Sequence, residues 1–423
     1  MDAGITLPEP DSLPAGCGPL ILADRETARP LRQQVFEHVR AAGAIPRVDL
    51  SKELGVSPAS VTAAAAELIE LGLIHEIDRP RRDGDVLRGR PPVALGVRPA
   101  SGRVAGVKLS DRVQSAIIVD LAGGVLAEAS IERPLLGQDT ERLLLDATEI
   151  LDAALSLAGL SRDDVAAVGF GLPGVIDSTC GHVHWSPLMR ERGIDLGPAL
   201  AERLRRPVCL DNDANLVTLA ELWFGAGRTR SDFAVVTIEH GLGMGLVLNH
   251  RLVRGARGLG LEIGHTKVQM DGALCRCGQR GCLEAYVADY ALVREATTAL
   301  NWGNRGVQSP QILLESLYDH AKAGNEAARA IFNRAGRYLA LGLANVVTLY
   351  DPSLILLSGE RLRYDYLYAE EVLSEMLALT LDTGRAAPEV EIRAWGDQVW
   401  ARGAAAMALD HATGAVLAAE ATA

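Results

Sequence analysis

The sequence predicts an α/β protein in which a small N-terminal helical unit with a β-hairpin precedes a larger body of mixed sheets. Residues 31–74 show helical spacing of apolar residues interrupted by glycines. From Val104 onward the pattern changes to short β runs, which later alternate with helices. A chain of 423 residues is also too long for one ordinary domain.

The composition is that of an ordinary globular protein, with 48% hydrophobic and 23% charged residues. No uncharged apolar stretch reaches the length of about 18 residues that predicts a transmembrane helix. Residues 1–24 are rich in Pro and Gly and contain no Lys or Arg, which does not fit a secretory signal. We expect a disordered leader over 1–24 and a cytoplasmic protein without a membrane partner.

Charge is distributed unevenly along the chain, whose formal net charge is −12. Residues 25–98 hold 12 basic and 10 acidic residues, a balance of +2. Residues 99–423 hold 30 basic and 40 acidic residues, a balance of −10. A basic N-terminal unit on an acidic body is compatible with a nucleic-acid partner for the first part only.

The first predicted helix covers residues 31–42, where Leu31, Val35 and Val39 share one face and Gly43 supplies the stop. A short second helix is predicted around Leu50 and Leu54, ending at Gly55. A third helix begins after Ser57, the expected N-cap, with Pro58 in the first turn. It buries Val61, Ala65 and Leu68 and ends near Gly72.

A short helix, a glycine-containing turn and a second helix form a helix-turn-helix, whose second helix reads the DNA major groove. The Ser and Thr side chains near the start of that helix can hydrogen-bond phosphates or base edges, and the Ala methyl groups can contact thymine. An ordinary packed helical pair is the alternative interpretation. The residues predicted to contact DNA in this unit are Arg47, Ser57, Ala59, Ser60 and Thr62.

The segment after the third helix predicts a wing. Leu73, Ile74 and Ile77 are expected in its first strand, and residues 79–92 read RPRRDGDVLRGRPP. An extended peptide with Arg88 and Arg90 suits a narrow, electronegative minor groove. The alternative is a solvated basic linker. The winged helix-turn-helix with this linker is therefore assigned to residues 25–98, and the remaining body to 99–423.

The body begins with an antiparallel meander of β runs. Further elements are expected as helices over 140–157, from 211 through Phe224 and near 325–350, as strands at 165–171, 207–210 and 354–359, and as a hairpin over 233–249. Residues 262–284 form the most specific segment, because three cysteines lie on glycine-rich turns downstream of a histidine. His265, Cys275, Cys277 and Cys282 predict a closed, structural Zn²⁺ site, and free or disulfide-prone thiols are the alternative.

Several motifs together resemble the ROK family (repressors, open reading frames and kinases), within it the NagC/XylR-type transcriptional regulators. The resemblance covers about residues 28–410. It rests on the following runs: Gly264-His265, Cys275-Arg276-Cys277-Gly278 and Gly281-Cys282-Leu283-Glu284; Leu210-Asp211-Asn212-Asp213-Ala214-Asn215; Gly171-Leu172-Pro173-Gly174-Val175-Ile176-Asp177; and Gly89-Arg90-Pro91-Pro92 beside the helix-turn-helix.

The resemblance implies a two-lobed, actin-like or ribonuclease-H-like sugar-kinase fold, a sugar site between the lobes, zinc and oligomerisation. By match to the family motifs, Asn212, Asp213, Glu262, His265 and Glu284 are the sugar-binding residues, and Asp213 aligns with the catalytic base of the kinases. Carboxylates and an amide are suited to reading the hydroxyls of a polyol. The alternative is that these groups are ordinary turn and capping residues.

Departures from the kinase pattern favour a regulator over an enzyme. Lys108 stands where the kinases carry an acidic residue, and Glu239-His240-Gly241 replaces a Gly-Thr-Gly phosphate loop. The expected function is a sugar-responsive DNA-binding regulator, a repressor of carbohydrate-metabolism genes acting on an operator as a homodimer or homotetramer. The alternatives are a ROK sugar kinase with a fused DNA-binding domain and a regulator controlled by protein–protein contact.

Overall fold

The computed structural model describes residues 16–20, 29–78, 93–238, 241–300, 302, 309–359, 370–381, 384, 386–393, 396 and 398–419. The N-terminal unit contains the three predicted helices and a three-stranded sheet in the order β1-β3-β2. Its elements are α1 (Leu31–Ala42), β1 (Ile45–Pro46), α2 (Arg47–Leu54), α3 (Pro58–Glu70), β2 (Ile74–Asp78) and β3 (Val93–Val97).

The helix signals in the sequence place these elements correctly. Ser57 caps α3, its side chain accepting a hydrogen bond from the Ser60 N–H at 3.1 Å, and Pro58 stands in the first turn. Gly55 ends α2 in a left-handed conformation with φ of 62°. The apolar faces meet in one core that includes Val39, Leu50 and Val61, all fully buried. The pairing of β2 with β3 is antiparallel, as a wing requires.

The body contains two five-stranded sheets with the same strand order. In each sheet the first three strands run antiparallel, and the fourth and fifth lie parallel on the other side of the first strand. The first sheet comprises β4 (Arg103–Lys108), β5 (Val113–Asp120), β6 (Val125–Glu132), β7 (Val168–Leu172) and β10 (Val208–Asn212). The second comprises β11 (Phe233–Ile238), β12 (Leu242–Leu248), β13 (Arg251–Val253), β14 (Leu354–Ser358) and β15 (Glu389–Arg393). The repeated order confirms the predicted two-lobed fold.

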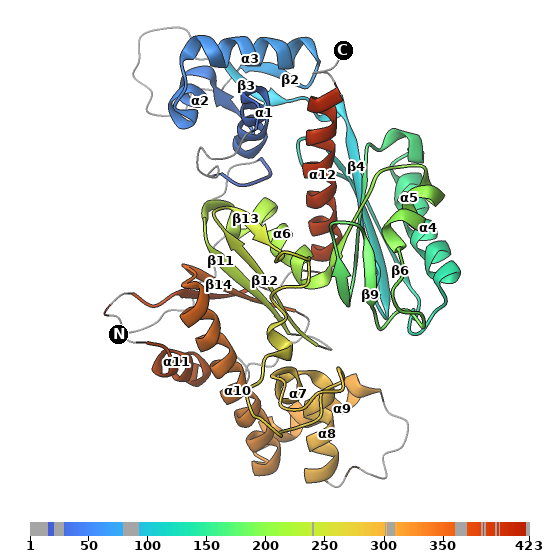
Figure 1. Cartoon of the computed structure of the whole chain (residues 1–423), viewed down its shortest axis with the longest axis vertical. Coiled ribbons are helices and arrows are strands. Elements are labelled where there is room, and N and C mark those ends of the chain that lie inside the picture. The colour runs from blue at the N-terminus through green and yellow to red at the C-terminus, as the bar shows by residue number, and fades with distance from the viewer. Residues whose placement is uncertain are drawn as a thin grey trace.

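Two helices join the lobes. α6 (Asp213–Phe224) packs against the second sheet, and α12 (Val399–Ala419) packs against the first. The two helices also pack against each other, so that α12 and α6 lie between the sheets (Figure 1). Their backbones approach closely, because a Cβ at Gly403 would lie 1.8 Å from the Leu216 carbonyl oxygen. Gly106 of the central strand β4 admits α12 in the same way.

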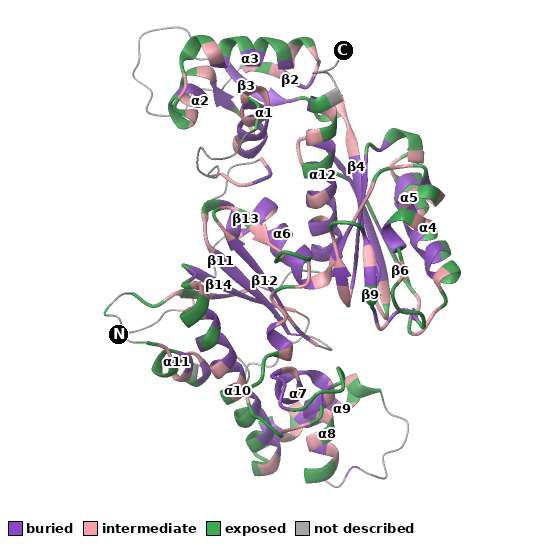
Figure 2. Cartoon of the chain, in the orientation of Figure 1, coloured by how far each residue is buried: buried purple, intermediate pink, exposed green. Residues whose placement is uncertain are grey.

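The remaining elements cover the outer faces. On the first lobe they are α4 (Thr140–Leu157), the hairpin β8 (Val175–Asp177) and β9 (His182–Trp185), and α5 (Leu196–Leu204). On the second lobe they are α7 (Glu284–Val287), α8 (Asp289–Ala299), α9 (Pro310–Lys322), α10 (Glu326–Tyr350) and α11 (Glu370–Leu379). Short 3₁₀ turns occur at Pro99–Ser101, Arg162–Asp164, Ala226–Thr229 and Ile263–His265. The central strands are buried and the outer helix faces exposed (Figure 2).

The N-terminal unit is joined to the first lobe and α6 through a continuous buried cluster. Arg40 of α1 is 3% exposed, donates from Nη1 to Thr413 Oγ1 of α12 at 2.7 Å, and lies 4.5 Å from the Trp223 ring centroid. Arg228, also buried, donates to the carbonyl oxygens of Ala41 and Gly18 at 2.5 and 3.1 Å. These contacts hold the end of α1 between α6 and α12.

The predicted disordered leader is wrong for residues 16–20. Cys17 is 2% exposed, and its N–H donates to the Arg40 carbonyl oxygen at 3.1 Å. The Gly18 N–H donates to the Trp223 carbonyl oxygen at 2.8 Å. Proline and glycine content predicted disorder here, whereas the backbone is satisfied by partners far away in the sequence. The rest of the leader lies outside the described residues.

The predicted tip of the wing, residues 79–92 with Arg88 and Arg90, also lies outside the described residues. None of the helices in the described part of the chain combines the length and apolar character that a bilayer span requires. The division at residue 98 stays a prediction.

We expect the N-terminal unit to lose stability in mild acid because of His38. Burial lowers the pKa of this imidazole to about 4, and Glu53 approaches it only to 3.8 Å. Between about pH 6.5 and pH 4 the unfolded chain binds a proton that the folded chain does not. The free energy of unfolding therefore decreases as the pH is lowered through this range, by up to about 3 kcal/mol.

Thermal unfolding followed by circular dichroism from pH 7 to pH 4 tests this expectation. His38→Gln should flatten the pH dependence of the melting temperature, and His411→Gln, at an exposed histidine of α12, should leave it unchanged. Equal pH dependence in His38→Gln and the unmodified protein would contradict the expectation.

Candidate functional site

The connection between β10 and α6 is held by buried polar groups. Asn212 caps α6, its Oδ1 accepting from the Asn215 N–H at 2.8 Å. Asp211 is 1% exposed, accepts from the Asn215 side-chain amide at 2.8 Å, and pairs with Arg254 at 2.7 Å. These bonds fix the orientation of the first turn of α6, from which Asp213 projects. The supporting roles of Asn215 and Arg254 were not predicted.

Three carboxyl groups that are distant in the sequence lie close enough to interact. Burial, together with the neighbouring carboxylates of Asp213 and Glu284, raises the pKa of the Glu262 carboxyl to about 7. Burial also raises the pKa of Asp213, which nearby Lys108 opposes. A carboxyl group with a pKa near 7 donates a hydrogen bond when protonated and accepts when ionised. The group therefore offers both functions to a ligand with hydroxyl groups.

Glu284, at the start of α7, connects these carboxyl groups with the cysteine segment. Its Oε2 accepts from the Leu242 N–H at 3.3 Å, and its Oε1 accepts from the Tyr290 hydroxyl at 3.3 Å. The Cys275 thiol donates to the same Oε1 at 3.6 Å. The predicted sugar-binding residues and the predicted metal ligands therefore adjoin each other in space.

The four predicted metal ligands come together in the structure. One ligand atom from each of His265, Cys275, Cys277 and Cys282 lies within 4.8 Å of every other. The Cys275 Sγ is 3.7 Å from the His265 Nδ1, and the Cys277 and Cys282 Sγ atoms are 3.7 Å apart. None of these cysteines forms a disulfide. The cluster can hold a metal ion with thiolate and imidazole ligands.

Two further side chains touch the thiols, and sequence reasoning missed both. Lys267 Nζ lies 3.1 Å from the Cys282 Sγ. The Tyr290 hydroxyl lies 3.5 Å from the Cys275 Sγ. Lys267 is close to the motif in sequence, whereas Tyr290 reaches the site only because α8 follows α7 directly.

Lys108, at the end of β4, occupies the neighbourhood of Asp213. Its Nζ lies 3.5 Å from the centroid of the Trp400 ring. A cation at this position attracts the Asp213 carboxylate. The segment Glu239–His240, the second departure from the kinase pattern, lies outside the described residues, and Gly241 follows it at the start of the second strand of the hairpin.

The exposed residues near the start of α3 have small side chains. Ser57, Ala59 and Thr62 are exposed, and Ser60 is half-buried. The Thr62 hydroxyl donates to the Pro58 carbonyl oxygen at 2.8 Å, so its methyl group is left toward solvent. The exposed face of α3 is visible at the outer edge of the molecule (Figure 2).

Arg47, the other predicted DNA contact, is only partly available. Its Nη2 pairs with Glu76 Oε1 of β2 at 2.8 Å. The ion pair ties the start of α2 to the base of the wing, so it gives Arg47 a structural role as well.

The match to known proteins spans most of the chain. The model of the ROK family matches residues 104–411. A xylose repressor from Caldicellulosiruptor bescii is 27% identical over 337 residues, which is 78% of this chain and 82% of the relative.

Among solved structures, a ROK family transcriptional regulator described as a homologue of the Escherichia coli MLC protein has a TM-score of 0.73 and 27% identity. The match covers 92% of this chain and 97% of that one. A ROK hexokinase from Thermus thermophilus has a TM-score of 0.61 and 31% identity, but the match covers only 72% of this chain and 97% of the hexokinase. With a family model that matches both lobes and solved relatives of the same fold, this chain belongs to the ROK family.

Proposed function

We propose that this protein is a sugar-responsive, DNA-binding transcriptional regulator, acting as a repressor of carbohydrate-metabolism genes. The observation that carries the proposal is the attachment of a helix-turn-helix unit, through buried contacts of Arg40, to the helix that bears the sugar-binding motif. The relatives named as a repressor and as a transcriptional regulator support it, and the match to the regulator covers 92% of this chain whereas the match to the hexokinase covers 72%.

The DNA-binding element of the proposal is α3. Small side chains at Ala59 and Thr62 allow a helix to seat deeply in the major groove, and Ser57 and Ser60 at its N-terminus suit phosphate contacts. Arg88 and Arg90 would follow the minor groove from the wing. A regulator of this kind acts in the cytoplasm, and a homodimer or homotetramer would place two α3 helices on a two-fold symmetric operator.

The sugar-binding element consists of Asn212, Asp213, Glu262, His265 and Glu284. The amide, the carboxyl groups and the imidazole provide donors and acceptors at fixed positions, as vicinal hydroxyl groups require. Asn212 uses its Oδ1 as the cap of α6 and keeps its NH₂ group for a ligand. A sugar bound here would touch α6 at its first turn.

Zn²⁺ is the metal that we propose for the cluster. Zinc–sulfur bonds of about 2.3 Å in a tetrahedron separate two thiolates by about 3.8 Å, and the Cys277 and Cys282 Sγ atoms are 3.7 Å apart. Three thiolates and one imidazole fill the coordination sphere, which is the pattern of a structural site. With Nδ1 of His265 facing Cys275, the other ring nitrogen remains for a sugar hydroxyl.

The path from sugar to DNA in this proposal is α6 itself. Asp213 is its first residue, and Trp223 near its other end packs under Arg40 of α1. Its 12 residues correspond to about 18 Å of helix. A sugar that binds two arrangements of the lobes with different affinity would tilt α6 and displace α1 with it.

An enzymatic role is not part of the proposal. A lysine at position 108, attracted to Asp213, takes the place of the acidic group that holds metal and phosphate in the kinases of the family. We therefore assign Asp213 to ligand binding and not to proton abstraction. A kinase with a fused DNA-binding domain stays the alternative function.

Thr62→Asp should weaken DNA binding, because a carboxylate on the exposed face of α3 would be repelled by phosphates. Fluorescence anisotropy with a duplex selected from a random pool is expected to show at least about a tenfold loss of affinity. Thr298→Asp provides the matched control, because Thr298 is an exposed threonine of α8 that also bonds to the preceding helical turn. Full affinity of Thr62→Asp for the duplex would exclude α3 as the recognition helix.

Asp213→Asn should remove sugar binding in calorimetric titrations with hexoses, pentoses and amino sugars, since a carboxylate that accepts two hydroxyl protons is lost. It should also leave the DNA affinity of the sugar-free protein unchanged. ADP release assayed with the same sugars tests the kinase alternative. Turnover above background that Asp213→Ala abolishes would establish the kinase, and absence of sugar binding together with a protein partner in pull-downs would favour control by protein contact.

Purified protein should contain about one zinc ion per chain, and its removal should lower the melting temperature strongly, because structural zinc in small sites contributes on the order of 10 kcal/mol. Cys282→Ser should have the same effect, and Cys180→Ser, at an exposed thiol outside the cluster, should have none. Zinc content is read by atomic emission and stability by calorimetry. Protein that is free of zinc and equally stable would refute the site.

A further inference from the structure

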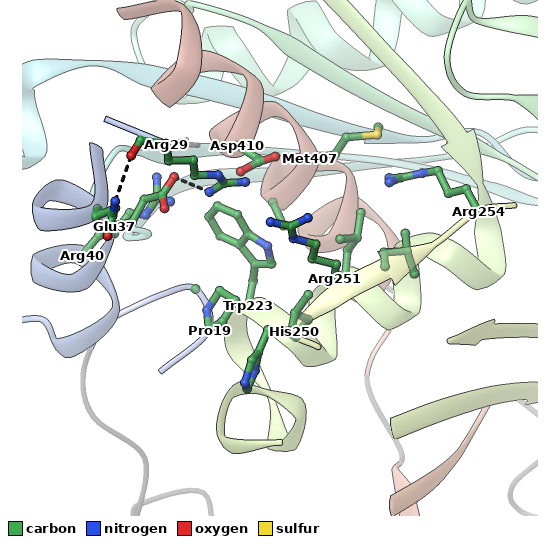
Figure 3. Close-up of a pocket in the computed structure, with 16 residues that line it drawn as sticks. Pro19, Arg29, Glu37, Arg40, Trp223, His250, Arg251, Arg254, Met407 and Asp410 are labelled. Atoms are coloured by element: carbon green, nitrogen blue, oxygen red, sulfur yellow. Dashed lines mark hydrogen bonds and ion pairs between the residues drawn. The ribbon is translucent and has the colours of Figure 1, made fainter. Parts of the chain in front are cut away.

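A cavity of about 310 Å³ lies at the junction of the N-terminal unit with the body. It is bounded by α1, by the end of α6, by β13 and by α12, and the Trp223 indole stands in its middle (Figure 3). None of the residues proposed to bind a sugar lines it, and two of them, Asn212 and Asp213, lie at the opposite end of α6. The volume is at the lower end of the range for small-molecule sites.

The lining of this cavity is cationic, in contrast to the net charge of −12 of the whole chain. Two carboxylates face a larger number of basic groups: the lining includes Glu37 and Asp410 against Arg29, Arg40, Arg251, Arg254 and His250. Arg29 donates a hydrogen bond to Glu37 at 2.6 Å, and Arg254 pairs with Asp211, which lies outside the cavity. Arg40 and Arg251 then remain, with Asp410 as the one other carboxylate of the described lining, so these two arginines leave one positive charge in excess.

Arg40 is the first of them. It is 97% buried, yet no carboxylate among the described residues lies within ion-pair distance of it. Its Nε is a buried donor without a hydrogen-bond partner, although Nη1 reaches Thr413. Aromatic faces compensate part of the charge, with Trp223 at 4.5 Å and Phe36 at 5.5 Å. A buried guanidinium is costly unless an anion and hydrogen bonds satisfy it.

Arg251 is the second. It is exposed and has no ion pair within the described part of the chain. Its guanidinium group and that of Arg29 turn into the cavity near the Trp223 indole (Figure 3). The Arg251 guanidinium and the face of the Trp223 indole therefore border one space (Figure 3).

We propose that this cavity is a second effector site, which binds a small metabolite carrying a phosphate or carboxylate group between Arg40 and Arg251. Guanidinium groups bind both kinds of anion through paired N–H donors. The apolar part of the ligand would lie against Trp223 and the neighbouring Leu219 and Met407. The site is independent of the sugar-binding residues and does not rest on the function proposed for them.

Such an anion would act on the position of the DNA-binding unit. Arg40 belongs to α1, Trp223 to α6 and Arg251 to β13, so one ligand would bridge the N-terminal unit and both elements of the body. It would favour the arrangement in which these three lie together, and change DNA affinity if the DNA-bound arrangement differs from it.

Calorimetric titration of the full chain with inorganic phosphate and with citrate, at constant ionic strength, tests the proposal. We expect saturable binding of at least one of the two probes. Arg251→Gln should weaken it at least about tenfold, the effect of losing one charge-assisted hydrogen bond. Arg251 is chosen because it is exposed, whereas Arg40→Met would alter the buried junction.

Two control variants test whether the probe binds in this cavity. Arg192→Gln removes an exposed arginine of the first lobe that does not line the cavity, and this variant should bind the probe as the unmodified protein does. Asp213→Asn should also retain the probe. Absence of saturable binding, equal affinity in Arg251→Gln and the unmodified protein, equal loss in Arg192→Gln, or loss in Asp213→Asn would each overturn the proposal.

Discussion

The close contact of α6 with α12 is the constraint on which the rest of the structure depends. Each helix covers one of the two sheets, and at Gly403 no side chain separates the two backbones. A larger residue there would push the lobes apart, and with them every group that has one partner on each side. The arrangement of the carboxyl groups, the junction cavity and the position of α1 all depend on how closely the backbones of α6 and α12 approach each other.

The same contact explains how a change at a site in the body can alter the position of the N-terminal unit. α6 carries Asn212 and Asp213 at its beginning and Trp223 near its end, and a helix of this length is stiff. α12 reaches the N-terminal unit independently through Thr413. The two helices are in contact with each other, and both also contact α1. A relative motion of the lobes would therefore move α1 as well.

Local sequence signals predicted the secondary structure well. The helix over 31–42, the cap at Ser57 and the helix over 140–157 match the structure, because each depends on spacing and capping within a few residues. The metal cluster was equally predictable, since three of its four ligands lie within eight residues. Residues far apart in sequence, such as Asp213, Glu262 and Glu284, were grouped only through the resemblance to a family.

Features that depend on long-range packing could not be predicted. Nothing around Cys17 distinguishes a packed segment from a disordered one, because the Cys17 and Gly18 N–H groups donate to the distant carbonyl oxygens of Arg40 and Trp223. Arg40 itself has the sequence pattern of a surface residue near a helix end. Its burial arises from the position of α12, more than 370 residues later in the chain.

The packing of residues 16–20 bears on how this protein can be divided or recombined. The N-terminal unit is not a module that could be cut out near residue 98 and transplanted. Its inner side is completed by the upstream segment 16–20 and by groups of the body such as Arg228. Chimaeras that exchange DNA-binding units between relatives would therefore have to exchange the leader with them and match the residue facing Arg40.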